Sequence, residues 1–124
     1  MRIYSKELNS LDYRVLKEGV AVSAGACLKM AEGGLVLCEA TDKPEFISNT
    51  TKVGDGTVIP VDKVTPDATL AGELAANKAD LEIGQKLSIS ADGTMVAVAA
   101  GALEVVGFDG TTEGARVLVV VAVS

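Results

Sequence analysis

Glycine-rich turns divide most of this sequence into short apolar runs, and this spacing strongly limits the fold it can form. All thirteen glycines fall at or after Gly19. The runs between them have the length of β-strands, whereas helices in globular proteins are usually longer. With few helix signals after residue 18, the pattern predicts a mainly β fold for residues 19–124.

The clearest predicted hairpin lies near the middle of this region. Asp92 and Gly93 form a tight turn between two alternating segments, Lys86–Ser90 and Thr94–Val98. The register set by the turn agrees with the apolar pattern, as expected for a true hairpin. The expected cross-strand pairs are Ser90 with Met95, Ile89 with Val96, and Leu87 with Val98.

A second hairpin is predicted around the glycine pair that follows Glu32, between Ala26–Met30 and Leu35–Ala40. Its register places Cys27 directly opposite Cys38. The two thiols could form a redox pair or half of a metal site, but the chain has no His and no third Cys to complete a zinc site. We interpret both as small buried apolar residues that stay reduced in the cytoplasm.

Together these segments predict a small antiparallel β barrel or sandwich of about seven to nine strands. The consecutive valines Val119–Val121 make both faces of the last strand apolar, which is expected of a strand that is central in its sheet or lies at a subunit contact. Ala71–Lys78 contains helix-favouring residues but is short and includes Gly72. The other strand candidates are Phe46–Thr50, Thr57–Val64, Ala102–Phe108 and Arg116–Val123.

Residues 1–18 differ from the rest and are interpreted as an N-terminal arm ahead of a β domain at 19–124. This arm contains both tyrosines and two of the three arginines. An apolar stripe at helical spacing runs through Tyr4, Leu8, Leu11 and Val15. Two interpretations are open: the arm packs on its own domain as a short helix or strand, or it docks on another protein.

Composition excludes several classes of function. The absence of His removes His-based catalysis and His metal sites, and no carboxylate pair stands out as catalytic. A net charge of −6 is opposite to that of a typical nucleic-acid binder. The longest apolar run, Val117–Val123, is too short to span a membrane, and the polar N-terminus predicts no secretory signal. We therefore expect a cytoplasmically made structural or binding protein, not an enzyme, without cofactor or metal.

The tripeptide Asp-Gly-Thr occurs three times, beginning at Asp55, Asp92 and Asp109. A calcium loop needs several clustered oxygen ligands, and none of these copies supplies them. Glycine allows a positive φ and aspartate accepts local hydrogen bonds, so we interpret all three as turns.

Five stretches share a pattern of glycine spacing and apolar alternation: Leu16–Met30, Ala40–Phe46, Asp55–Pro66, Leu81–Gly93 and Leu103–Val121. In this pattern the chain resembles the small capsid decoration (cement, head-stabilising) proteins of tailed bacteriophages. The resemblance implies a structural virion protein that binds the outer capsid surface, commonly as a homotrimer. There it would tie major capsid protein subunits together against the pressure of internal DNA. It also implies an N-terminal arm that often becomes ordered only on the capsid.

The arm is therefore the candidate contact surface for the major capsid protein or for a neighbouring decoration subunit. Tyr and Arg are frequent at the energetic centres of interfaces. No nucleic-acid or membrane partner is expected, and the apolar strand Val117–Val123 is expected to contribute to the trimer. The candidate contact residues are Arg2, Tyr4, Lys6, Leu8, Leu11, Tyr13 and Arg14.

Two other functions remain open at this point. One is a host small-molecule-binding or carrier β-barrel domain, in which Lys29 or Lys43 would be the modified lysine. Both residues faintly resemble the biotinyl or lipoyl lysine of carrier domains in their neighbours, although Lys29 lies before the glycine turn rather than at its tip and Lys43 is followed by Pro44. The other is a phage tail component.

Overall fold

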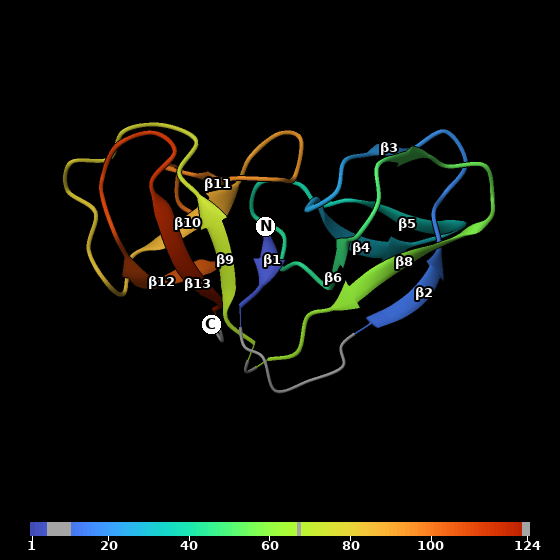
Figure 1. Ribbon diagram of the computed structural model, residues 1–124, viewed down its shortest axis with the longest axis horizontal. Coiled ribbons are helices and arrows are strands. Elements are labelled where there is room, and N and C mark those ends of the chain that lie inside the picture. Colours follow the sequence, from blue (N-terminus) through green and yellow to red (C-terminus); the bar gives the residue numbers. More distant parts are fainter. Residues whose placement is uncertain (5–10, 67, 123–124) are drawn as a thin grey trace.

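The computed structural model describes residues 1–4, 11–66 and 68–122, and these form two packed β lobes (Figure 1). No helix occurs among the described residues, so the predicted mainly β fold is confirmed. The N-lobe has a five-stranded antiparallel sheet, β2-β8-β6-β4-β5, and a small β3-β7 pair. Its strands are β2 (Leu11–Val15), β3 (Ala21–Val22), β4 (Cys27–Ala31), β5 (Gly34–Leu37), β6 (Phe46–Ser48), β7 (Lys52–Val53) and β8 (Val58–Lys63).

The C-lobe has a six-stranded antiparallel sheet with the order β1-β9-β13-β12-β10-β11. Its first strand comes from the N-terminus, and the other five come from the second half of the chain. The strands are β1 (Arg2–Ile3), β9 (Leu70–Glu73), β10 (Lys86–Ile89), β11 (Val96–Ala97), β12 (Leu103–Phe108) and β13 (Arg116–Val121).

Both predicted hairpins form. In the first, Ile89 pairs with Val96, and the Ser90 N–H donates to the Met95 carbonyl over 2.9 Å. The predicted pair of Leu87 with Val98 is absent, because the ladder ends at Ala97 and the chain then crosses over β10. In the second hairpin, β4 and β5 pair in the predicted register, and the Cys38 N–H donates to the Cys27 carbonyl over 3.0 Å.

The N-terminal region forms strands rather than a helix where the structure describes it. β1 pairs with β9 in the C-lobe, and β2 pairs along its whole length with β8 in the N-lobe. The helical spacing was therefore the wrong periodicity for residues 11–15, which alternate between outward and inward positions as a strand does. Of the two open interpretations, packing on the chain's own fold describes these segments.

Two hydrophobic clusters form the core. One fills the N-lobe, whose sheet curls into a half-barrel so that Leu16 bridges Leu35 on the opposite edge strand. The other lies under the C-lobe sheet and also includes Cys27, Cys38 and Ile47 from the N-lobe. The shared cluster fixes the two lobes to each other.

Strand β13 is central in its sheet, between β9 and β12, which is one of the two positions expected for an apolar last strand. Val117 and Val119 are fully buried. The alternate residues, Leu118 and Val120, are partly exposed on the outer face. These two apolar side chains are therefore only partly covered by the described part of the chain.

Candidate protein-contact surface

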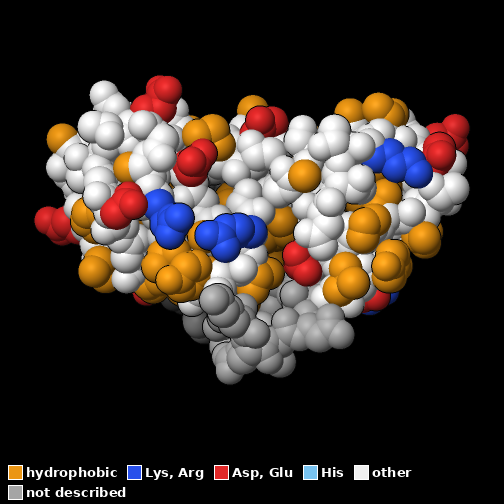
Figure 2. Space-filling model, viewed as in Figure 1, with side chains coloured by type: hydrophobic (Ala, Val, Ile, Leu, Met, Phe, Trp, Pro, Cys, Tyr) orange, Lys and Arg blue, Asp and Glu red, His pale blue; other side chains and the backbone are white. Residues whose placement is uncertain are grey.

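An outward row of large apolar side chains lies on β2 and the adjacent end of β8. Leu11, Tyr13 and Val15 are 49%, 59% and 38% exposed, and Val58, the ladder partner of Val15, is 54% exposed. We call these four residues the outward row. Figure 2 shows apolar side chains gathered over the end of the molecule that holds β2 and β8. Contiguous exposed apolar residues of this kind are typical of protein-contact surfaces.

The inward residues of β2 explain how this strand is held in place. The Arg14 guanidinium lies 2.8 Å from the Asp12 carboxylate and 5.4 Å from the centre of the Phe46 ring. A hydrogen bond from the Tyr13 N–H, and then the nearby Arg14 charge, lower the pKa of Asp12. Arg14 is thus engaged within the chain, and its main role is to orient the strand that presents the outward row.

The backbone edge of β2 is closed at its middle residue. The Pro60 carbonyl accepts a hydrogen bond from the Asn49 N–H, so the backbone polar group of Pro60 points toward β6 and not toward β2. Tyr13 is the ladder partner of Pro60, so its backbone N–H and carbonyl point away from β8, toward the open edge of the sheet. The Tyr13 N–H does not remain free there, because it donates to Asp12 Oδ1 over 2.8 Å. An exposed charge on an edge strand discourages addition of another strand. This surface is therefore better suited to contact through side chains than to sheet extension.

The other predicted contact residues are distributed over different parts of the molecule. Arg2 is exposed on β1 in the C-lobe, opposite Ala71. Tyr4 is 44% exposed, and its N–H donates to the Thr69 carbonyl over 2.7 Å. Lys6 and Leu8 lie outside the described residues.

Of the predicted residues that the structure describes, only Leu11 and Tyr13 come together in the outward row. Val15 and Val58 complete that row but were not among the candidates. The signal that identifies Val15 is the period-two alternation of residues 11, 13 and 15. Val58 could not be found in this way, because its place beside Val15 depends on the pairing of β2 with β8.

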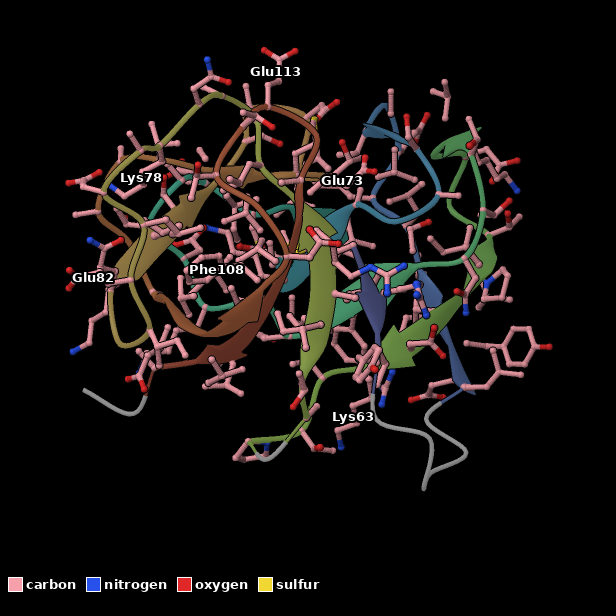
Figure 3. The ribbon with its side chains drawn as sticks, turned by 60° about the vertical axis from the view of Figure 1, so that its left-hand side comes forward. Lys63, Glu73, Lys78, Glu82, Phe108 and Glu113 are labelled. Carbon is pink, nitrogen blue, oxygen red and sulfur yellow. The ribbon has the colours of Figure 1, made fainter. Side chains whose placement is uncertain are left out.

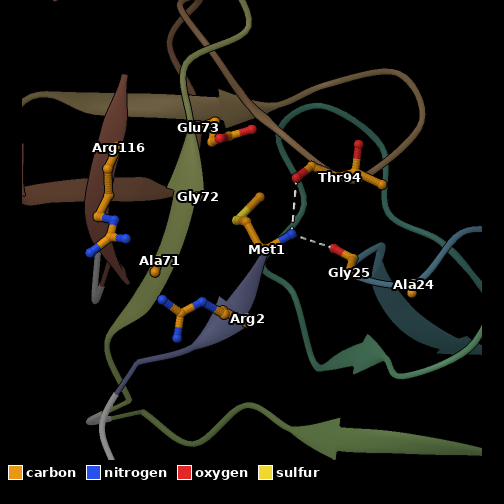
Figure 4. Close-up of a pocket in the computed structure, with 9 residues that line it drawn as sticks. All are labelled: Met1, Arg2, Ala24, Gly25, Ala71, Gly72, Glu73, Thr94 and Arg116. Atoms are coloured by element: carbon orange, nitrogen blue, oxygen red, sulfur yellow. Dashed lines mark hydrogen bonds between the residues drawn. The ribbon is translucent and has the colours of Figure 1, made fainter. Parts of the chain in front are cut away.

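A pocket of about 320 Å³ opens where the two lobes meet (Figure 4). The Met1 amine donates to the carbonyl oxygens of Gly25 and Thr94 over 2.6 and 2.9 Å, and burial is the main reason that its pKa is lowered. A Cβ at Gly25 would lie 2.9 Å from this nitrogen, so only glycine fits beside it. The pocket is lined by Met1, Arg2, Ala24, Gly25, Ala71, Gly72, Glu73, Thr94 and Arg116.

The remaining candidate groups are structural in their surroundings. Lys29 lies within β4 and forms an ion pair with Asp42 at 2.6 Å, so it is not the free lysine at a turn tip that a carrier domain presents. Cys27 and Cys38 are buried free thiols, and burial raises the pKa of each to about 12. Among the described residues, no cluster of three or more His, Cys, Asp or Glu side chains could hold a metal ion.

The Asp-Gly-Thr tripeptides act as turns in two related ways. Asp55 and Asp92 each accept hydrogen bonds from both the backbone N–H and the hydroxyl of the threonine two residues later. Asp109 instead accepts the Arg116 N–H over 2.9 Å, which closes the connection between β12 and β13. Across the described part of the chain, no helix is long and apolar enough to cross a membrane.

In comparisons with known proteins, no family model, no curated protein and no solved structure matches this chain.

Proposed function

We propose that this protein decorates the outer surface of a tailed-phage capsid and stabilises the shell by bridging major capsid subunits. The outward row is the observation that carries the proposal, because it offers four large apolar side chains on a rigid strand pair. The sequence resemblance to capsid decoration proteins supplies the class of partner. Shell binding through this row requires no catalytic group.

The magnitude of the expected contact fits a protein that acts in many copies. Burying an apolar side chain that starts about half exposed contributes about 1 kcal/mol, so the row contributes about 4 kcal/mol in all. Loss of translational and rotational freedom opposes this gain. One copy would therefore bind weakly, and simultaneous contacts within an oligomer on a repeating shell would make the attachment strong.

The proposal includes a homotrimer formed through exposed apolar residues of β12 and the end of β13. Val106 and Phe108 on β12 are 39% and 37% exposed, and Val120 on β13 is partly exposed. A second copy that covered these side chains would remove them from water. The net charge of −6 is compatible with a coat component that must not bind the packaged DNA.

Co-sedimentation with undecorated capsid shells of a tailed phage tests the proposal. The variant carries both Leu11→Ser and Tyr13→Ser, and we expect its affinity to fall by about 30-fold, the equivalent of about 2 kcal/mol. Ile83→Ser is the matched control, because Ile83 is 69% exposed on the C-lobe turn before β10. Figure 3 shows the adjacent Glu82 at the end of the C-lobe, far from β2.

Four outcomes would contradict the proposal. Wild-type protein that fails to bind shells would remove the capsid function, and binding to isolated tails alone would favour a tail component. Equal loss in the Ile83→Ser control would show that the outward row is not the contact surface. Native mass spectrometry that reveals a bound small molecule or a modified lysine would favour the carrier class.

A further inference from the structure

Folding brings two of the chain's three arginines to one face of the C-lobe. Arg2 on β1 pairs with Ala71, and Arg116 on β13 pairs with Glu73, so the two arginines lie on opposite sides of β9. Because Ala71 and Glu73 are two residues apart in one strand, their ladder partners project from the same face of the sheet. Figure 4 shows the two guanidinium groups on either side of the small Ala71 side chain.

Neither guanidinium has an ion-pair partner among the residues that the structure describes. Glu73 is adjacent to Arg116 in the ladder, but Figure 4 shows its carboxylate directed away from the Arg116 guanidinium. The third arginine, Arg14, differs because it is already paired with Asp12 at 2.8 Å. Two exposed guanidinium groups, neither paired with a described residue, therefore lie on one face of a chain whose net charge is −6.

The surroundings favour a carboxylate on a polypeptide over a free anion. Both arginines line the pocket of about 320 Å³, whose lining also includes the short side chains of Ala24 and Ala71. A guanidinium presents paired N–H donors that match the two oxygens of a carboxylate. Leu118 lies next to this pocket, because it pairs in the ladder with the lining residue Ala71, and its side chain is partly exposed. Figure 2 shows basic side chains beside an apolar cluster on this face. An apolar neighbour suits the next side chain of a peptide and adds nothing for an inorganic anion.

We propose that this pocket, with Arg2 and Arg116, binds a carboxylate side chain in an acidic-apolar segment of the partner polypeptide. The inference rests on the proposed function only for the identity of that partner as the shell protein. It adds a second contact, charge-assisted and on the C-lobe, to the apolar contact of the outward row. Such a contact weakens with added salt, whereas the apolar contact does not.

A short peptide of alternating Glu and Leu is the first probe, titrated into ¹⁵N-labelled protein and followed by NMR. We expect progressive shifts of the Arg2 and Arg116 side-chain N–H signals and of the Leu118 amide. Arg116→Gln should weaken binding at least tenfold. Lys52→Gln is the matched control, since it removes the same charge from a side chain that already pairs with Asp55 in the N-lobe, and it should leave peptide binding unchanged. Thermal unfolding of each variant verifies that the fold is intact.

Inorganic phosphate at the same concentration is the second probe. Shifts with phosphate and none with the peptide would overturn the inference in favour of a free-anion site. Equal peptide binding by wild type and Arg116→Gln would also overturn it.

Shell co-sedimentation at low and high salt then separates the two proposals. Peptide binding without shell binding would remove the capsid function and leave the pocket standing. Shell binding that Arg116→Gln does not weaken at low salt would remove this pocket from the shell contact and leave the capsid function standing.

Discussion

Two buried serines in this fold should respond in opposite directions when their hydroxyls are removed. Ser48 and Ser88 are each only 1% exposed. The Ser48 hydroxyl donates to the Thr50 carbonyl over 2.6 Å and accepts the Thr50 N–H over 3.1 Å. The Ser88 hydroxyl has no hydrogen-bond partner among the described residues, because the chain near Gly101 crosses directly over it.

The size of each effect follows from these contacts. A buried polar group without a partner costs about 1–3 kcal/mol of desolvation, so Ser88→Ala should raise the free energy of unfolding by about 1 kcal/mol. Ser48→Ala removes two hydrogen bonds from the partly buried backbone N–H and carbonyl of Thr50, so it should lower that free energy by about 1–3 kcal/mol. Both substitutions remove a single oxygen atom, which makes each the control for the other.

Urea unfolding followed by circular dichroism measures both changes under identical conditions. Thermal unfolding gives a second measure, in which a change of 1 kcal/mol in the free energy of unfolding of a chain of this size shifts the melting temperature by about 3–5 °C. Ser88→Ala should raise the midpoint and Ser48→Ala should lower it. If Ser88→Ala destabilised the protein as much as Ser48→Ala, the Ser88 hydroxyl would have a stabilising partner, and the reasoning would be refuted.

Three further predictions concern the turns and the thiols. Gly25→Ala should destabilise the protein by about 2 kcal/mol or more, because its φ is +89° and its Cβ would meet the N-terminal amine. Gly19→Ala, with a φ of +85° and open space, should cost only about 1 kcal/mol in urea unfolding. Hydrogen bonds, chiefly from the Thr94 hydroxyl, lower the pKa of Asp92, so stability should fall as pH drops below its ordinary value of 3.8. In an acid-unfolding series, Asp92→Asn should make that loss smaller, and an unchanged pH profile would contradict this assignment. Cys27 and Cys38 should both alkylate under denaturing, non-reducing conditions but resist alkylation in the native protein, whereas an unalkylated denatured mass would reveal a disulfide.

The success of the sequence predictions depended on how local their physical cause is. The Asp92-Gly93 hairpin was predictable because its turn residues and its alternation are neighbours in sequence. Strand β9 was missed because the residues Leu70–Glu73 neither alternate clearly nor favour strands, and they become a strand through pairing with β1 and β13.

The candidate site followed the same division. Leu11 and Tyr13 could be selected from sequence by residue type. Their position on one face of a strand was not predicted, because Leu11 and Val15 also fitted the apolar spacing of a helix. The proximity of Arg2 and Arg116 had no sequence signal, since it arises from two ladders that meet on β9. Pairing between segments that are distant in sequence therefore determines which residues share each surface, and no local sequence pattern predicts that pairing.

The position of β1 has a bearing on how the chain folds during synthesis. All strands of the N-lobe lie between residues 11 and 63, so this lobe can form while the second half of the chain is still being made. β1 precedes the N-lobe in sequence but pairs with β9, which follows the N-lobe in sequence. β1 therefore cannot pair until the whole N-lobe and β9 have been synthesised. Pulsed hydrogen exchange should show protection in β4 and β8 before β9 becomes protected. Until β9 arrives, the Met1 side chain and the apolar residues it will cover remain open to solvent or to a chaperone.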